Sequence, residues 1–330
     1  MSSDTFVWTE VYNCGEIGAV AISSFLKHHP NIVVHVFGSA EDLLLIPDSA
    51  TVMKIMLPSG FGRGLSSWLW RKLGAGSSSI TEDYLKNGFA RGHLGTARLW
   101  AYLINCRPEA KMIHFDSDII FLGDVVTELK KRLDTYDLVG PVRNYKHNPN
   151  NLDHVRHLAD VTQTYCFGFN KHKINCHRYG ELVRMCLGSY NPKEHPVIDF
   201  FDPVMFEILG NRGSISFLNH DEVGGCNLQG SRLNAFSAVN DFATPFKIDF
   251  GSKLIHFSAV GSGVNIYRNK TVRMPESYRK YALDRYALFT KVFYNHDIGI
   301  DLSSYETLIE HLKKIDTKQW IYQNDSIKVG

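Results

Sequence analysis

The stretch TFVWTEVYNCGEIGAVAISSFLKHHPNIVVHVF, residues 5–37, decides the fold class of this chain. Residues 5–12 have the composition of a strand, and residues 15–27 carry apolar side chains at the spacing of one helix face. Residues 32–37 form a nearly continuous apolar run, which is typical of a strand buried on both faces. Two strands joined through a helix by short connections favour a parallel sheet covered by helices. We therefore expect an α/β fold.

The composition of the 330 residues is that of a folded protein with a sizeable core, since 44% are hydrophobic and 21% are charged. The formal net charge is only +2, so no global electrostatic pull toward nucleic acid is expected. No apolar run is long enough to span a bilayer, and the acidic N-terminus lacks a secretory signal, so we expect a cytoplasmic protein. The six cysteines include no CxxC pair that would indicate a zinc site.

The same patterns predict further elements along the chain. Strands are expected at residues 51–57, 111–115, 137–142, 164–169, 214–218 and 253–257, and helices from Gly92 to Pro108 and at 125–133 and 202–210. Residues 286–294 and 303–315 have helical spacing, and Ser303 and Glu306 form a capping box for the second of them. We expect residues 1–270 to form the sheet domain and residues 271–330 a helical extension packed on it.

Residues 59–79 are rich in glycine and serine and predict a mobile loop. This loop contains Trp68 and Trp70, followed by Arg71 and Lys72. We favour a short helix that packs on the body of the domain. The alternative is an aromatic and basic patch that makes peripheral contact with a membrane or folds over a ligand.

The sequence becomes chemically specific at Asp116-Ser117-Asp118, directly after the predicted strand 111–115. An extended backbone would aim both carboxylates at one side of the sheet. Such a pair repels unless a hard divalent cation, Mg²⁺ or Mn²⁺, neutralises it, and that cation can also hold the oxygens of a diphosphate. The alternative is a strand-to-turn junction where aspartates cap local amides.

A second polar element lies much later, at the end of the predicted strand 253–257. His256 stands there, close to the glycines Gly261 and Gly263. A neutral imidazole beside a flexible turn can be a third metal ligand. By itself, His256 would be interpreted as an ordinary half-buried histidine, and only its pairing with the acidic site favours a ligand.

The order of these motifs resembles the nucleotide-sugar glycosyltransferases of the GT-A fold, and within them family 8. The motifs are Ser23-Ser24-Phe25, Thr96-Ala97-Arg98-Leu99-Trp100, residues 113–120, Gly123-Asp124-Val125, Phe167-Gly168-Phe169-Asn170 and Leu254-Ile255-His256-Phe257. The resemblance implies a Rossmann-like, mixed central sheet flanked by helices. It also implies that Asp116, Asp118 and His256 are metal ligands. The nucleotide sugar would be bound by Thr9, Tyr12, Arg98, Asp116 and Ser117.

The activity that the resemblance implies is metal-dependent transfer of a sugar from a nucleotide diphosphate sugar, UDP-linked in this family, to a glycan or another hydroxyl acceptor. The cation, Mn²⁺ or Mg²⁺, would stabilise the departing nucleoside diphosphate. The sequence departs from the family after His256, because Ala259 replaces an expected glycine and no Lys-Pro-Trp follows. Lys253, Arg268 or Lys270 would then have to reach the diphosphate.

A reaction that inverts the anomeric centre also needs a carboxylate as general base on the acceptor hydroxyl. We favour Asp199 and Asp202 for this role over Asp221 and Glu222. Asp202 precedes Pro203 and is equally well interpreted as a helix N-cap.

Three other functions compete with sugar transfer. A haloacid dehalogenase-like phosphatase uses strand-D-x-D with the first Asp as nucleophile, but it usually carries Thr or Val where Ile119 stands here. A nucleotidyltransferase usually has a basic, glycine-rich loop near its N-terminus, and residues 9–15 contain no Lys or Arg. A non-catalytic module that binds a sugar nucleotide would keep the metal site without turnover.

Overall fold

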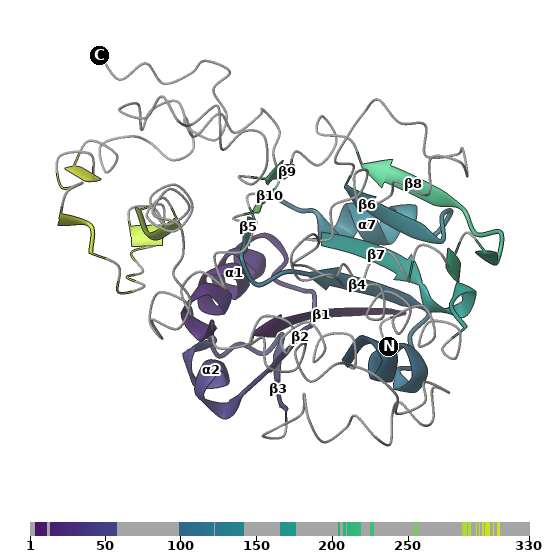
Figure 1. Cartoon of the computed structure of the whole chain (residues 1–330), viewed down its shortest axis with the longest axis horizontal. Helices are drawn as coiled ribbons and strands as arrows, with labels where there is room; N and C mark the ends of the chain where they lie inside the picture. The colour runs from purple at the N-terminus through teal and green to yellow at the C-terminus, as the bar shows by residue number, and fades with distance from the viewer. Residues whose placement is uncertain are drawn as a thin grey trace, which may run out of the picture.

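The computed structural model of the chain is built on a seven-stranded sheet (Figure 1). The structure describes residues 4–11, 14–57, 99–121, 123–141, 166–175, 204, 207–208, 210–218, 225–227, 254–256, 286–288, 290–291, 295, 297, 299, 301–303, 306 and 309–310. The strands of this sheet are β1 (Thr5–Val11), β2 (Val34–Gly38), β3 (Val52–Met56), β4 (Lys111–Phe115), β6 (Leu138–Pro141), β7 (Cys166–Asn170) and β8 (Ile215–Leu218). Their order across the sheet is β3-β2-β1-β4-β7-β6-β8.

The large sheet is mixed. Strands β3, β2, β1 and β4 run parallel to one another, whereas β7 is antiparallel to both of its neighbours, β4 and β6. The helices α1 (Gly15–His28) and α2 (Ala40–Leu45) connect β1, β2 and β3, and α7 (Val126–Arg132) precedes β6. The predicted α/β fold with a mixed central sheet and flanking helices is therefore confirmed.

A second, smaller sheet has the order β5-β10-β9 and was not predicted. Its strands are β5 (Ile119–Phe121), β10 (Leu254–His256) and β9 (Gly225–Asn227). Strand β10 runs antiparallel to β5 and parallel to β9. The chain leaves the large sheet at the end of β4 and enters the small sheet at β5, so the two sheets are joined through residues 116–118.

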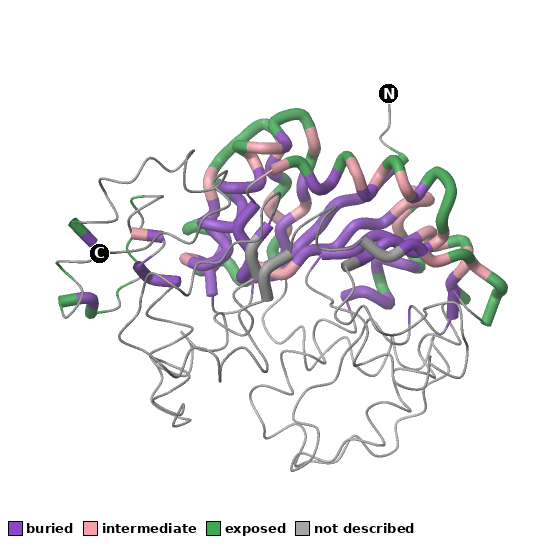
Figure 2. Tube along the Cα trace, turned by 90° about the horizontal axis from the view of Figure 1, so that it is seen from above, coloured by how far each residue is buried: buried purple, intermediate pink, exposed green. Residues whose placement is uncertain are grey.

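The two faces of the large sheet bury different kinds of side chains. On one face, Val7 and Val11 of β1 form a single apolar core with Ile17 of α1 and Leu129 of α7. On the other face, Trp8 makes an edge contact with Trp100, from the helix that runs through residues 99–106. Figure 2 shows the buried residues along the strands and the exposed ones in the outer connections.

The alternation along β1 explains these two layers, because neighbouring residues of a strand point to opposite faces. Close packing on the α7 side is visible at Gly168 of β7, where an added Cβ would lie 2.7 Å from Cδ1 of Leu133.

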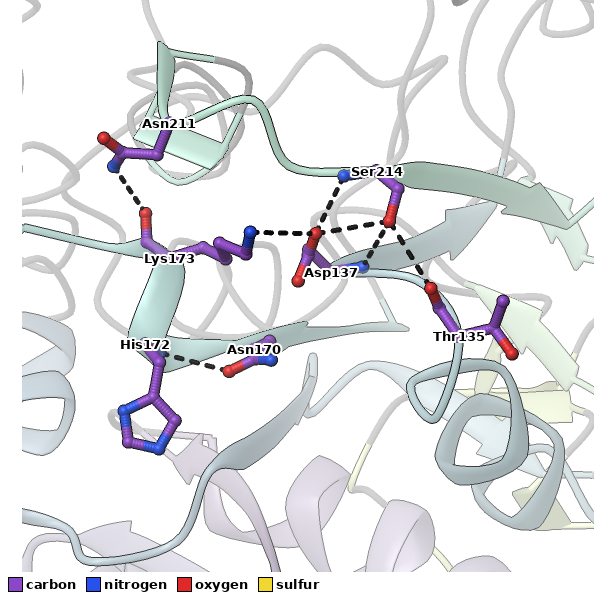
Figure 3. A network of polar contacts seen from close by, with 7 residues as sticks. All are labelled: Thr135, Asp137, Asn170, His172, Lys173, Asn211 and Ser214. Atoms are coloured by element: carbon purple, nitrogen blue, oxygen red, sulfur yellow. Dashed lines mark hydrogen bonds and ion pairs between the residues drawn. The ribbon is translucent and has the colours of Figure 1, made fainter.

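A network of polar contacts lies where β6 and β8 begin, at the end of the sheet opposite the Asp116-Ser117-Asp118 turn (Figure 3). The amide of Ser214, just before β8, donates to Oδ2 of Asp137 at 2.9 Å, and the amide of Asp137 donates to the Ser214 carbonyl at 2.8 Å. Nζ of Lys173 lies 3.8 Å from the same Asp137 oxygen, and Nδ2 of Asn211 donates to the Lys173 carbonyl. These contacts hold β6 and β8 in their parallel register.

Most predicted boundaries differ from the observed ones by one or two residues. Strand β2 begins at Val34 rather than at residue 32, and α1 ends at His28 rather than at residue 27. Of the C-terminal extension, the structure describes Tyr286, which is fully buried and donates its hydroxyl to the Ile17 carbonyl of α1 at 3.3 Å. That contact joins residue 286 to α1, and the division of the chain into a sheet domain and an extension from residue 271 stays a prediction.

The described residues include no helix with the length and apolar character that a bilayer crossing requires.

Candidate functional site

Asp116, Ser117 and Asp118 form the passage between the two sheets. Asp116 directly follows β4, whose two neighbours are β1 and β7, and residues 117 and 118 form a turn before β5. The prediction that an extended backbone orients both carboxylates is wrong in this respect, because the chain turns between them. The side chain of Asp116 is one-third exposed, at 34%, whereas Asp118 is buried.

The small sheet brings His256 to this turn. In the antiparallel register of β10 and β5, His256 pairs with Ile119, the residue that immediately follows Asp118. The acidic turn in the middle of the chain and the histidine near its end are therefore neighbours in the backbone of one sheet. A site shared by these residues requires this juxtaposition.

Strand β9 lies on the other side of His256. In the parallel register of β10 and β9, Asn227 pairs with His256 on the side away from β5. Strand β9 was not predicted, because a three-residue strand is too short for its period to show in the sequence.

The residues at the turn fit a divalent cation in their donor chemistry. Two carboxylates suit Mg²⁺ or Mn²⁺, and an imidazole donor extends the set toward Mn²⁺. Among the side chains that the structure describes, no three His, Cys, Asp or Glu residues form a cluster able to hold a metal ion. The fit therefore rests on Asp116 and Asp118 together with the backbone register of His256.

A buried hydrogen-bond network centred on Glu10 of β1 lies next to Asp116. Its Oε1 accepts hydrogen bonds from Nε1 of Trp100 at 2.7 Å and from Nε1 of Trp8 at 3.2 Å. Its Oε2 lies 2.6 Å from Nε2 of His114, on β4. The other ring nitrogen of His114, Nδ1, is 3.9 Å from Oδ1 of Asp116.

The network also sets the charge of His114. Burial by itself lowers the pKa of this imidazole, but the charge and hydrogen bond of Glu10, with the charge of Asp116, together raise the pKa above its ordinary value. Neither Glu10 nor His114 is among the predicted site residues. The available signal was a charged and a polar residue inside strands that are otherwise apolar.

The start of α1 approaches the acidic turn as well. Sγ of Cys14, the residue before α1, lies 3.5 Å from Oγ of Ser117. The amide of Gly15 donates to Oδ1 of Asp42 in α2 at 2.9 Å, so the first turn of α1 is already capped. On β7, burial and a smaller effect of the Asp116 charge raise the pKa of the Cys166 thiol, which keeps this thiol protonated.

His29, at the end of α1, holds the segment that follows β5. Its Nε2 accepts the amides of Val125 and Val126 at 3.1 and 3.2 Å, and its Nδ1 lies 3.1 Å from the Phe25 carbonyl. Burial lowers the pKa of His29 to about 4, although the nearby Asp124 carboxylate acts in the opposite direction. A neutral His29 therefore caps the first turn of α7.

The remaining predicted site residues divide into two groups. Thr9 lies on β1 with its side chain fully buried, and its hydroxyl has no hydrogen-bond partner in the described part of the chain. The others lie outside the described residues: Tyr12, Arg98, Asp199, Asp202, Trp68 and Trp70. Their roles in nucleotide binding, catalysis and membrane contact stay predictions.

No protein-family model matches the sequence, and no curated protein matches it significantly. Solved structures do match. One is a galactosyltransferase, LgtC, in complex with donor and acceptor sugar analogues, at 11% identity and a TM-score of 0.43; the match covers 83% of this chain and 99% of that one. Mouse xyloside xylosyltransferase 1 matches at 12% identity and a TM-score of 0.42, over 76% and 97% of the two chains.

A third similar structure is the glycosyltransferase GlyE from Streptococcus pneumoniae TIGR4. It matches at 12% identity and a TM-score of 0.43, over 76% of this chain and 54% of that one. The identities and TM-scores are low, so neither an activity nor a substrate is carried from these three proteins to this chain.

Proposed function

We propose that this chain is a metal-dependent glycosyltransferase of the GT-A type. It would move a sugar from a nucleotide diphosphate sugar, UDP-linked by its resemblance to family 8, to a glycan or another hydroxyl acceptor. The observation that carries the proposal is the register of β10 with β5, which puts His256 opposite Ile119 and next to the Asp116-Ser117-Asp118 turn.

In this proposal Asp116, Asp118 and His256 hold Mn²⁺ or Mg²⁺. When bound, the cation neutralises the diphosphate and so stabilises it as a leaving group. The exposure of Asp116 supports this assignment, because a carboxylate that is one-third exposed can be reached by a ligand, whereas Asp118 is buried. Asp199 or Asp202 would remove the proton of the acceptor hydroxyl if the anomeric centre is inverted.

The test is thermal stabilisation by UDP-sugars with and without Mn²⁺, followed by release of UDP. A ligand that binds only the folded protein stabilises it by about 2.7 kcal/mol at a hundred times its Kd. We expect the protein to be stabilised by a UDP-sugar only when Mn²⁺ is present. Asp118→Ala should abolish metal-dependent turnover and leave the fold intact, and Asp118→Asn should do the same with less change of volume.

A matched control is Asp48→Ala, because the Asp48 side chain is 97% exposed and pairs only with Lys54 at 2.7 Å in the described contacts. This variant should keep full turnover. Full activity of Asp118→Ala would remove the proposal.

The competing functions give different results in the same assays. A phosphatase would hydrolyse phosphate monoesters without needing a nucleotide sugar. A non-catalytic module would be stabilised by the UDP-sugar and Mn²⁺ but would release no UDP over hours of incubation. Either result would replace sugar transfer as the function of the site.

A further inference from the structure

Ser24 is a fully buried serine in the middle of α1. Its Oγ donates to the Ala21 carbonyl at 2.8 Å and accepts the amide of Phe121, in β5, at 3.0 Å. A serine inside a helix is less favourable than an alanine, and a hydroxyl that bonds back to its own helix does not stabilise that helix. The specific contribution of Ser24 is therefore its contact with β5, 97 residues further along the chain.

Strand β5 depends on this contact because only one of its edges is paired with another strand of the small sheet. It stands at the end of the order β5-β10-β9, and in its register with β10 the residue opposite Ile119 is His256. The amide of Phe121 is directed to the other edge, where Oγ of Ser24 accepts it. A buried amide without an acceptor is costly, so the loss of this oxygen would favour a displacement of β5.

Helix α1 contacts the segment that contains β5 at three successive places. Near the start of the helix, Cys14 contacts Ser117 of the acidic turn. At its end, His29 accepts the amide of Val125, at the start of α7. The contact of Ser24 lies between these two and is the one that holds the strand itself.

Helix α1 is in turn fixed to the large sheet. An added Cβ at Gly18 would lie 2.3 Å from Cγ1 of Val11, in β1, so the helix and this strand pack with no space between them. The place of β5 beside the large sheet is therefore set through α1.

We infer that Ser24 is a positioning residue for the cation site at the acidic turn. By accepting the amide of Phe121 it fixes β5, and the register of β5 with β10 keeps His256 next to that turn. Ser24 itself would contact neither the cation nor the substrate, because it acts through the backbone of β5. The inference rests on the proposed function, since it assigns ligands from both sheets to one cation.

Two substitutions of Ser24 separate the hydrogen-bond acceptor from the packing. Ser24→Ala removes the acceptor and changes the volume little. Ser24→Thr keeps a hydroxyl oxygen but adds a methyl group at a fully buried position, which lowers stability by overpacking.

Two control variants accompany them. Ser23→Ala removes the neighbouring serine of α1, which is exposed and donates to the Ala19 carbonyl at 2.7 Å. Gly168→Ala lowers stability on β7, where the added Cβ would lie 2.7 Å from Cδ1 of Leu133. It also provides a destabilised reference if Ser24→Thr does not fold.

The readouts are the Kd for Mn²⁺ without nucleotide, amide exchange in the metal-free protein, and its melting temperature. We expect Ser24→Ala to weaken Mn²⁺ binding by about tenfold, at the lower end of the loss for residues that orient metal ligands. Amide exchange should become faster in β10 but not in β1. We expect the other three variants to bind Mn²⁺ within about threefold of the wild type, although Ser24→Thr and Gly168→Ala should melt at lower temperatures.

A purely structural role makes the loss of Mn²⁺ affinity follow the melting temperature in all four variants, and that result overturns the inference. An unchanged Kd in Ser24→Ala overturns it too, as does a loss in Ser24→Thr as large as in Ser24→Ala, and in both cases the proposed function stands. A wild-type protein that binds no Mn²⁺ overturns both. If Ser24→Ala does not fold, Ser24→Cys replaces it, because a thiol fills the space but is a weak acceptor. A loss of about threefold or more then supports the inference, and an unchanged Kd overturns it.

Discussion

The neutral His29 imidazole makes the stability of this protein depend on pH. In the fold, burial lowers its pKa from the ordinary 6.5 to about 4, and this effect outweighs that of the Asp124 carboxylate, whose Oδ1 lies 3.1 Å from Nε2. The same nitrogen accepts two backbone amides. Between these two pKa values the unfolded chain binds a proton that the folded chain does not. Stability therefore rises with pH in this window and is lost as the pH falls from about 6.5 to about 4.

The size of the effect follows from the two pKa values. Each unit of pKa difference corresponds to about 1.4 kcal/mol, so the whole window is worth about 3 kcal/mol. Acidification from pH 7 to pH 5 covers part of the window and should lower the free energy of unfolding by about 2 kcal/mol through His29 alone.

The assay is urea unfolding of the wild type and of His29→Gln at pH 7, 6 and 5. The glutamine carbonyl can accept the amides of Val125 and Val126 in place of Nε2, and it does not titrate. Other groups titrate in both proteins, so the difference between the two curves isolates His29. We expect the wild type to lose about 2 kcal/mol relative to His29→Gln between pH 7 and pH 5. A difference that stays constant over this range would refute the neutral-cap assignment.

Three further substitutions test the packing of the fold. Gly168→Ala should cost about 1–3 kcal/mol in urea unfolding, because the new Cβ would lie 2.7 Å from Cδ1 of Leu133. Trp100→Phe should cost about 1–3 kcal/mol, since Glu10 loses a 2.7 Å hydrogen bond; an unchanged unfolding midpoint would contradict that bond. Tyr286→Ala should cost about 3–5 kcal/mol because a fully buried ring is lost, and unaltered thermal melting would show that the C-terminal extension does not pack on α1.

The strands and helices with a strong periodic signal could be predicted from the sequence. The apolar run of β2 and the helical spacing of α1 predicted the α/β class directly. A strand buried on both faces is apolar throughout, whereas a helix buried on one face carries apolar residues at every third or fourth position. The six residues of α2 and the three-residue strands β5 and β9 could not be found this way, although β10 falls within the predicted strand 253–257. They are shorter than the window over which a period can be recognised.

The sequence indicated which residues to compare, but not the contacts around them. The Asp116-Ser117-Asp118 motif carries chemistry that residue type indicates, whereas His256 was selected only through its pairing with that motif, and the roles of these residues stay predictions. The link between Glu10 and His114 joins positions 104 residues apart, and Trp100 lies 90 residues from Glu10. No local pattern records such a pairing, so only the strand register of the folded chain reveals it.

The passage of the chain from one sheet to the other at residues 116–118 has a mechanical consequence. Asp116 lies at the end of the large sheet, and His256 lies in the small sheet. The strands of the small sheet are only three residues long, so the small sheet has little stability by itself. A cation bound by both Asp116 and His256 would link the two sheets at this turn. Loading the protein with Mn²⁺ should then slow amide exchange in β10 far more than in β1, which is held from both sides by its neighbours whatever is bound.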